Sequence, residues 1–428
     1  MIIQSAPVTK NVQTDYSSWP LYSLFLLLLG TSVFPVEFIS GLSAYFLLLA
    51  FFVWKSKKRS FPKSLQIVFV AFILMIAIGL VSGISNERYP YLKDAWYFIN
   101  PVIVIFVGYC FGAQTPLLRE GLRMVLIAGL ILACFHLLKF VLQPNMLSMP
   151  ATEVRALAGN GNFVVGLSVA LLLARLRSWP ATYAIPKSLG WLILVMCSAS
   201  VYLAFSRTLV LVAIIFWIAL RGLMVGSRFL KVFAVLTVGL VLLGSVAAYL
   251  PQATEMEKKT FSGKLLRSVQ ELTVADYQDA QSINDNFRGY ETAKALKSYA
   301  DGGPIAWLSG MGFGHFVDLG VSLALGDGPM RYIPVMHNGV MYVLVKTGAL
   351  GLTLYLFCFG WLFVRGLRAA SAGTAVETFA GKIAQGAVAI LLFTSWLISG
   401  PFNKSALFSI LLILGFVLSI VERKEWMK

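Results

Sequence analysis

Long runs of apolar residues recur from one end of this chain to the other, separated by short polar stretches. Each run holds about 17 to 22 residues, enough to cross a bilayer core roughly 30 Å thick as a helix. Runs such as LYSLFLLLLG and IVFVAFILMIAIGL do not alternate between polar and apolar positions, as the strands of a membrane β-barrel would. The pattern predicts an all-α polytopic membrane protein with about twelve transmembrane helices, near residues 20–36, 38–54, 64–83, 97–113, 122–142, 161–175, 188–205, 208–221, 231–250, 349–366, 382–399 and 405–421.

One long polar segment, residues 251–333, interrupts this pattern between the ninth and tenth predicted helices. Its stretches KLLRSVQELTVADYQDAQ and INDNFRGYETAKALKSYADGG carry apolar residues three or four positions apart, which indicates short amphipathic helices. A loop this long is usually functional or disordered, and its aromatic and helical content favours an ordered helical cap on the outer face. The chain then divides into residues 1–250 with nine helices, 251–333 as the cap, 334–348 as an interfacial helix that carries His337 and Asn338, and 349–428 with three helices.

Composition and charge agree with this topology. Hydrophobic residues make up 58% of the chain and charged residues 13%, against about 25% charged in soluble domains. With both termini in the cytoplasm, the inner connections carry most of the lysines and arginines, including KSKKR at 55–59, as the positive-inside rule requires. The net charge of +16 then reflects topology and contact with membrane lipids, and it does not indicate a nucleic-acid partner.

The cysteines and carboxylates indicate neither a disulfide framework nor a metal site. The four cysteines occur singly inside predicted helices and are expected to be small buried hydrophobes: Cys110, Cys134, Cys197 and Cys358. No D-x-D pair occurs in an outer loop, so the chain offers few ligands for Mg²⁺ or Mn²⁺. We therefore expect chemistry without a metal or another cofactor.

Three polar positions at the expected outer face are candidates for chemistry. Arg207, in FSRTLV, either snorkels to anchor a helix hairpin or faces a polar site, where its guanidinium would clamp an anion such as phosphate. Arg288, in NDNFRGYETAKAL, is either part of a solvated helix face or a second such cation. His337 lies at the start of the apolar run MHNGVMYVLVKTGALG. A lone histidine there is more often structural, but an imidazole with an ordinary pKa near 6.5 can serve as a general base.

Four further residues are weaker candidates for substrate binding. Asn338 adjoins His337, and Arg331 is one of the basic residues of the cap. Arg155, in TEVRALAGN, would line the entrance for a donor substrate. Asp94, in the outer loop ISNERYPYLKDAW, would orient an arginine or a histidine.

The spacing around His337 and Arg207 resembles the signatures of the O-antigen ligase and polymerase superfamily of bacterial envelope glycosyltransferases. In that family a histidine is followed by Asn, Ser or Gln, nine residues, a glycine, two residues, and a small residue or tyrosine. Its second signature is an arginine followed after three residues by leucine, at the outer end of a helix. The helix number, the single large outer loop and a glycine-rich stretch also match, whereas the amino-terminal third carries no matching motif. The matching residues are His337, Asn338, Gly348, Gly351, Arg207, Leu211, Gly310, Gly312 and Gly314.

The resemblance implies a GT-C-like enzyme that moves a glycan from undecaprenyl diphosphate to an acceptor hydroxyl, at the periplasmic face of a Gram-negative inner membrane. By this resemblance Arg207 and Arg288 stabilise the leaving diphosphate, and His337 deprotonates the acceptor. Such a displacement inverts the anomeric carbon and needs no metal. Gly348 and Gly351 permit the turn into the tenth helix, which would hold the imidazole at the depth of the lipid headgroups.

Several alternatives remain open. Within the family, a ligase that attaches O-antigen to lipid A-core is favoured over a polymerase and over a protein glycosyltransferase. Outside it, a transporter or flippase of lipid-linked glycans would place ionisable groups at mid-membrane, where His136 and Lys139 are the candidates. A non-enzymatic subunit of polysaccharide assembly is the third alternative.

Overall fold

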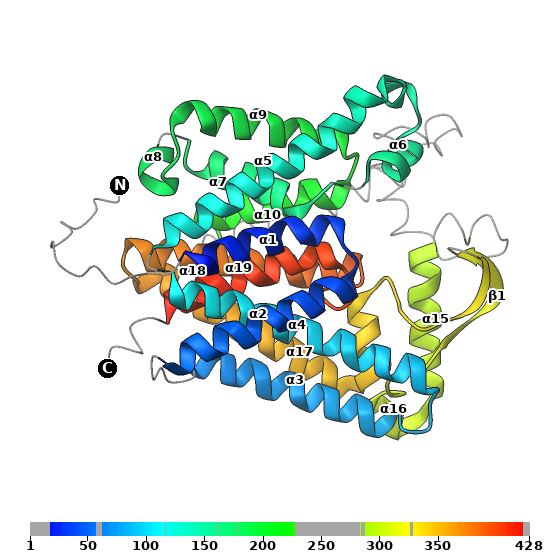
Figure 1. Cartoon of the computed structure of the whole chain (residues 1–428). Coiled ribbons are helices and arrows are strands. Elements are labelled where there is room, and N and C mark those ends of the chain that lie inside the picture. The colour runs from blue at the N-terminus through cyan, green and yellow to red at the C-terminus, as the bar shows by residue number, and fades with distance from the viewer. Residues whose placement is uncertain are drawn as a thin grey trace.

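The computed structural model describes residues 18–56, 62–115, 117–159, 161–176, 178–226, 283, 287–325 and 328–422. These ranges hold fifteen α-helices, one 3₁₀-helix and one antiparallel pair of strands (Figure 1). The elements are α1 (Trp19–Val33), α2 (Val36–Ser56), α3 (Lys63–Ser82), α4 (Arg88–Gln114), α5 (Leu118–Leu142), η1 (Pro144–Ser148), α6 (Ala151–Ala158), α7 (Phe163–Ala174), α8 (Trp179–Tyr183), α9 (Lys187–Leu203), α10 (Arg207–Leu220), α15 (Phe287–Asp301), α16 (Gly303–Ser309), β1 (Val317–Leu325), β2 (Gly328–Ile333), α17 (Gly339–Ala372), α18 (Ala375–Leu397) and α19 (Ser405–Val421).

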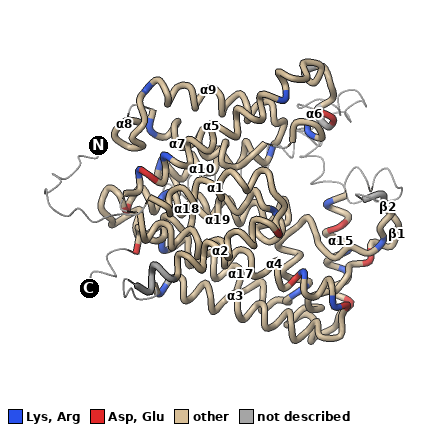
Figure 2. Tube along the Cα trace, viewed as in Figure 1, with Lys and Arg blue, Asp and Glu red and all other residues tan. Residues whose placement is uncertain are grey.

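The all-α class is confirmed, and the helices are apolar enough for a multi-pass membrane protein. Five of them are long and apolar enough to cross a membrane: α3, α4, α5, α17 and α18. Six shorter apolar helices coincide with further predicted spans: α1, α2, α7, α9, α10 and α19. The span predicted at 231–250 lies outside the described residues. Charged residues gather toward the two ends of the bundle, and the middle of the helices is nearly free of them (Figure 2).

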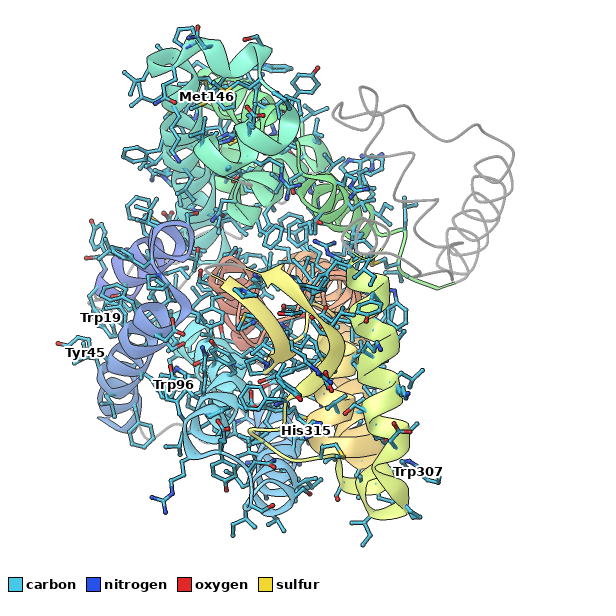
Figure 3. The ribbon with its side chains drawn as sticks, turned by 90° about the vertical axis from the view of Figure 1, so that its right-hand side faces the viewer. Trp19, Tyr45, Trp96, Met146, Trp307 and His315 are labelled. Atoms are coloured by element: carbon cyan, nitrogen blue, oxygen red, sulfur yellow. The ribbon has the colours of Figure 1, made fainter. Side chains whose placement is uncertain are left out.

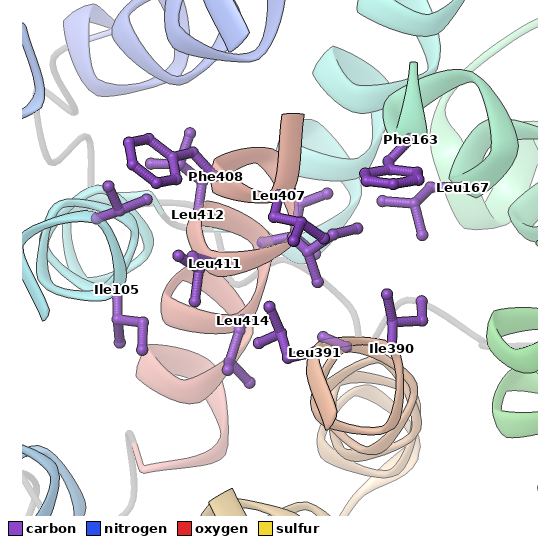
Figure 4. Close-up of a cluster of buried hydrophobic side chains, with 14 of the residues drawn as sticks. Ile105, Phe163, Leu167, Ile390, Leu391, Leu407, Phe408, Leu411, Leu412 and Leu414 are labelled. Carbon is purple, nitrogen blue, oxygen red and sulfur yellow. The ribbon is translucent and has the colours of Figure 1, made fainter. Parts of the chain in front are cut away.

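The core of the bundle is built around α19. Its sequence is apolar on every side, and every residue from Leu407 to Ile420 is buried. Figure 4 shows its leucines between Ile105 of α4, Phe163 of α7 and Leu391 of α18. A helix that is hydrophobic all round is stable only where other helices surround it, which explains its central place.

Glycines allow α4 and α19 to touch backbone to backbone. A Cβ at Gly108 would clash with the carbonyl group of Leu412, and Gly112 approaches α19 one turn further along. Gly415 makes the reciprocal approach to the carbonyl group of Ile105. Small residues four positions apart are a common means of close helix contact in membranes. Larger side chains at these positions would force the two helices apart.

The cap is helical only in part, which corrects the prediction for residues 251–333. α15 and α16 fall where helical spacing occurs, but the segment after them forms the hairpin β1–β2, in which Val317 pairs with Ile333. Val317 and Leu319 are buried while the residues after each of them are exposed, a two-residue period typical of a strand. The hydroxyl group of Tyr290 on α15 donates to the carbonyl oxygen of Leu319 at 2.5 Å. The stretch KLLRSVQELTVADYQDAQ lies outside the described residues.

The predicted interfacial helix and the tenth predicted helix follow each other in α17, with a break between them. α17 starts at Gly339, so the predicted interfacial helix 334–348 supplies its first turns, and His337 precedes the helix instead of lying within it. The break is at Gly348, where φ is 68° and ψ is −169°. Such a positive φ is costly for residues with a side chain, so glycine is what permits the chain to continue past this point.

Candidate active site

The residues predicted to carry chemistry gather toward one end of the bundle. α10, α17 and α19 all begin there, next to α6 and α15 (Figure 1). Arg207 is the first residue of α10, and His337 lies two residues before α17. This end therefore joins side chains from distant parts of the sequence.

Glu291 of α15 holds His337 in place. Its carboxylate accepts the backbone N–H of His337 at 3.0 Å and lies 3.3 Å from Nδ1 of the imidazole. The side chain of Glu291 is 1% exposed, whereas that of His337 is 44% exposed. A carboxylate next to Nδ1 favours the tautomer with the proton on that nitrogen, which leaves Nε2 as the basic nitrogen. The arrangement provides an oriented, accessible base.

Two further contacts fix the histidine. The ring of Phe287 meets the imidazole edge to face, with 5.7 Å between ring centroids. The backbone N–H of Ser399, in the connection between α18 and α19, donates to the carbonyl oxygen of His337. The imidazole is thus held from α15 on one side and from the α18–α19 connection on the other.

The positive charge of Arg288 acts on two other cations at this end of the bundle. Arg288 lies on α15, one turn before Glu291, and is exposed. Burial lowers the pKa of Arg155 on α6, and the positive charge of Arg288 lowers it further. Desolvation and the same charge of Arg288 lower the pKa of Lys404, the residue before α19. Arg288 is therefore near enough to Arg155 and Lys404 for its charge to act on both.

A tight helix hairpin sets the position of Arg207. Only three residues separate α9 from α10, and Phe205 among them has a positive φ of 45°. The side-chain oxygen of Ser206 then caps α10 by accepting the backbone N–H of Leu209 at 3.4 Å. Arg207 is half-buried at the start of the helix, toward the same end of the bundle as His337.

Asn338, predicted to bind substrate, has a structural role at the start of α17. Its side-chain oxygen accepts the backbone N–H groups of Val340 at 3.0 Å and Met341 at 3.2 Å, so it caps α17. The residue is buried, with 7% exposure. Asn is one of the residues preferred at this position of a helix.

Replacing Asn338 by alanine is expected to lower the free energy of unfolding by about 0.5–2 kcal/mol, because two backbone N–H groups lose their acceptor. Thermal unfolding of the purified protein in detergent measures this, with Asn338→Ser as the variant that keeps a cap. An alanine variant as stable as the wild type would contradict the capping role.

Asp94 lies in a buried ion pair, which corrects its prediction as part of an outer loop. It belongs to α4, and its carboxylate lies 2.6 Å from the ammonium group of Lys346 on α17. The side chains are 1% and 0% exposed. The hydroxyl group of Tyr342 donates to the same carboxylate at 2.5 Å, and the backbone N–H of Gly314 does so at 2.8 Å. Asp94 thus ties α4 to α17 and to the glycine-rich loop.

Lys346 adds a third ionisable residue to the two considered for transport. Besides its ion pair, it donates to the carbonyl oxygen of His315 at 2.5 Å. Of the other two, the imidazole of His136 lies 2.9 Å from the hydroxyl group of Ser200, and Lys139 donates to a backbone carbonyl group at 3.0 Å. Each of the three therefore has a polar partner within the protein.

The glycine-rich loop and the break in α17 form one structural unit. Gly310, Gly312 and Gly314 have φ values of 78°, 80° and 81°, and a Cβ at Gly348 would clash with the backbone of Leu308. The backbone N–H of Met311 donates to the carbonyl oxygen of Val345 at 2.7 Å, next to the break. At the second motif glycine, Gly351, the side chain of Thr347 occupies the space a Cβ would need. Glycine is required at the break because a backbone passes where a side chain would stand.

Arg331, the remaining predicted substrate-binding residue, is engaged within the hairpin. Its guanidinium makes two bonds to the carboxylate of Asp318, at 2.8 and 2.9 Å. This pair lowers the pKa of Asp318 to about 2 and raises the pKa of Arg331. Because both side chains are largely exposed, the pair adds little to stability.

Sequence reasoning missed Glu291 and Lys404 as members of the site. The signal for Glu291 was a carboxylate between the apolar positions of an amphipathic helix, one turn after Arg288.

The prediction that all four cysteines are buried is wrong for Cys134, which is exposed, while Cys110, Cys197 and Cys358 are buried. Within the described ranges, no group of three or more His, Cys, Asp or Glu side chains is arranged to hold a metal ion.

Comparison with known proteins assigns the chain to no family. No protein-family model matches it, and no curated protein matches it either. The function therefore rests on the oriented imidazole and on the cations near it.

Proposed function

We propose that this protein is an O-antigen ligase, a membrane glycosyltransferase that moves O-antigen polysaccharide from undecaprenyl diphosphate to a sugar hydroxyl of lipid A-core in lipopolysaccharide biosynthesis. The observation that carries the proposal is the pairing of His337 with the buried Glu291, one helical turn from the exposed Arg288. An oriented base next to cations suits a reaction in which a hydroxyl group loses a proton while a diphosphate departs.

The proposed reaction is a single displacement. Nε2 of His337 takes the proton of the acceptor hydroxyl, and the oxygen attacks the anomeric carbon of the donor glycan. The bond from that carbon to the diphosphate oxygen breaks, and its electron pair stays on the diphosphate. The acceptor enters opposite the leaving group, so the configuration of the anomeric carbon inverts. Glu291 keeps Nδ1 protonated and stabilises the imidazolium that forms.

Fixed positive charge would stabilise the leaving diphosphate. Arg288 and Lys404 approach from α15 and from the start of α19, and Arg155 approaches from α6. Arg207 would provide a further guanidinium from the start of α10. Guanidinium groups keep their charge and offer paired donors to phosphate oxygens, and for this reason we propose a reaction independent of metal ions.

The arrangement of charge supports a topology for this enzyme. The bundle end opposite His337 carries arginines within or directly after the terminal turns of its helices: Arg119, Arg123, Arg175, Arg221, Arg365 and Arg368. By the positive-inside rule that end is cytoplasmic. We propose a GT-C-like protein of about twelve membrane helices in a Gram-negative inner membrane, with both termini in the cytoplasm and the site facing the periplasm.

Transfer by the purified protein tests this function. With an undecaprenyl-diphosphate glycan donor, lipid A-core as acceptor and EDTA present, the wild type is expected to form the ligated product. Arg207→Ala and Arg288→Ala are each expected to lower the maximal rate about 10²–10³-fold, because each removes a cation from the developing charge. Arg119→Ala is the matched control, since this half-exposed arginine lies at the opposite end of the bundle.

Different outcomes separate the alternatives. Donor glycans that lengthen without lipid A-core would indicate a polymerase of the same superfamily. Loss of transfer in EDTA, with recovery on adding Mg²⁺ or Mn²⁺, would contradict the metal-independent reaction. A folded protein that transfers no glycan but moves the lipid-linked donor across proteoliposomes would replace the enzyme proposal with transport.

A further inference from the structure

A polar cavity lies in the cap, next to the candidate active site. It has a volume of about 470 Å³, within the range of about 300–1,000 Å³ usual for small-molecule sites. Six side chains able to bind polar groups line it, from α15, the glycine-rich loop and β1: Lys294, Lys297, Ser298, Asp301, His315 and Asp318. Figure 3 looks onto this end of the bundle, with His315 between the hairpin and α15. None of the six has a part in the proposed reaction.

One face of α15 connects this cavity with His337. Phe287 and Glu291, which contact the imidazole, are followed at spacings of three and four residues by Lys294, Ser298 and Asp301, which line the cavity. Residues at such spacings lie on one side of a helix. Lys294 and Ser298 are three and seven residues after Glu291, so the cavity lies roughly 5–10 Å along the helix from the base. That separation suits a short oligosaccharide with one hydroxyl at His337 and a neighbouring sugar in the cavity.

The cavity has side chains that can bind the acidic group and the hydroxyl groups of a ligand. Lys294 and Lys297 supply two positive charges, and Lys294 lies over the ring of Tyr290 at 5.2 Å from its centroid. Of the two carboxylates, Asp318 is paired with Arg331, which leaves Asp301 to accept hydroxyl groups. With Asp318 engaged by Arg331, two lysines and one carboxylate remain to contact a ligand.

His315 and Ser298 form a neutral pair in the same cavity. Nε2 of His315 lies 3.0 Å from the hydroxyl group of Ser298. Burial lowers the pKa of His315 to about 4; the charge of Lys346 adds to this effect and that of Asp94 opposes it. At neutral pH this pair thus offers hydrogen bonds without adding charge.

We infer that this cavity binds an acidic saccharide unit of the acceptor glycan, with its phosphate or carboxylate group on Lys294 and Lys297 and its hydroxyl groups on Asp301, Ser298 and His315. The cavity would then set the choice of acceptor, while His337 performs the proton transfer. The identity of this glycan as the acceptor rests on the proposed function, whereas binding itself does not.

Binding of simple probes tests the cavity directly. Isothermal titration of the full chain in detergent would compare glucose 6-phosphate, glucuronate, methyl glucoside and inorganic phosphate. We expect one of the two acidic sugars to bind more tightly than methyl glucoside and inorganic phosphate, and the better of them identifies the acidic group. Lys294→Gln with Lys297→Gln is expected to weaken that binding at least about tenfold, since each lysine offers a charge-assisted hydrogen bond. Lys187→Gln, which removes an exposed lysine from the start of α9, is the matched control.

Two binding results would overturn the inference. The first is an acidic sugar that binds no better than its neutral counterpart or than inorganic phosphate. The second is binding that the double substitution leaves unchanged. Neither result bears on His337, so the proposed function would stand.

The transfer assay adds a second readout. With an acceptor glycan that carries acidic groups, the double variant is expected to raise the KM for the acceptor and keep kcat. With an acceptor stripped of those groups, wild type and double variant are expected to have the same KM. A double variant with unchanged KM for the acidic acceptor would overturn the role in acceptor choice. Saturable binding of the probe in a protein that transfers no glycan would keep the site and reject the proposed function.

Discussion

His337→Ala is expected to lower the maximal rate of glycan transfer about 10²–10⁴-fold, the range by which a general base typically accelerates a reaction. The KM for donor and acceptor should change little, because the imidazole acts on the proton in the transition state and is not the main binding group. The histidine is 44% exposed, so its removal leaves the core intact. Initial rates at saturating acceptor measure the effect, and thermal unfolding checks that the variant is folded.

Glu291 provides the companion measurement. Glu291→Gln should also lower kcat and keep the KM for acceptor, because an amide cannot stabilise the imidazolium as the carboxylate does. Glu291→Asp, which restores the negative charge, should recover part of the rate. If the histidine only positions the acceptor, His337→Ala will raise KM while kcat persists, and that result would exclude the role as base. A Glu291→Gln variant with full kcat would exclude the carboxylate as its positioning residue.

Lys346→Met is expected to destabilise the protein by about 3–5 kcal/mol, the cost of leaving one partner of a buried ion pair without the other. The carboxylate of Asp94 would remain buried at 1% exposure with only Tyr342 and the N–H of Gly314 as donors. The carbonyl oxygen of His315 would lose its donor as well. Thermal unfolding in detergent, followed by tryptophan fluorescence, measures the loss.

A double variant makes this prediction specific. Lys346→Met with Asp94→Asn removes both charges and should recover much of the lost stability, since no uncompensated charge remains in the interior. Lys187→Met removes an exposed lysine and should have little effect. A single Lys346→Met variant as stable as the wild type would mean that the pair does not hold α4 and α17 together.

Much of the helix layout was predictable from the sequence because it depends on local patterns. A run of about twenty apolar residues has few alternatives to a helix in a membrane, since every backbone polar group needs a partner within the segment. α3 and α19 accordingly begin and end within a residue or two of their predicted bounds. The hairpin β1–β2 was missed because it is short and lies in a segment whose neighbours have helical spacing.

The site was predictable only in part. Its motif residues stand at fixed spacings in the sequence, so His337, Arg207 and Gly348 could be found as candidates. The residues that surround them could not be predicted, because a partner that is distant in the sequence leaves no local pattern. Glu291 is 46 residues from His337, and the Gly314 N–H that Asp94 accepts is 220 residues away.

Tertiary structure determined which partner each buried polar residue has. Asn338 and Asp94 were candidates for substrate binding in the sequence; in the fold, Asn338 caps α17 and Asp94 lies in a buried ion pair. A buried polar group needs a hydrogen-bonding partner, and only the packing of helices determines which partner is within reach. The sequence alone determined that the chain folds as apolar helices with a polar cap. The three-dimensional fold decided that Glu291 orients His337, because that pairing depends on how α15 lies against the start of α17.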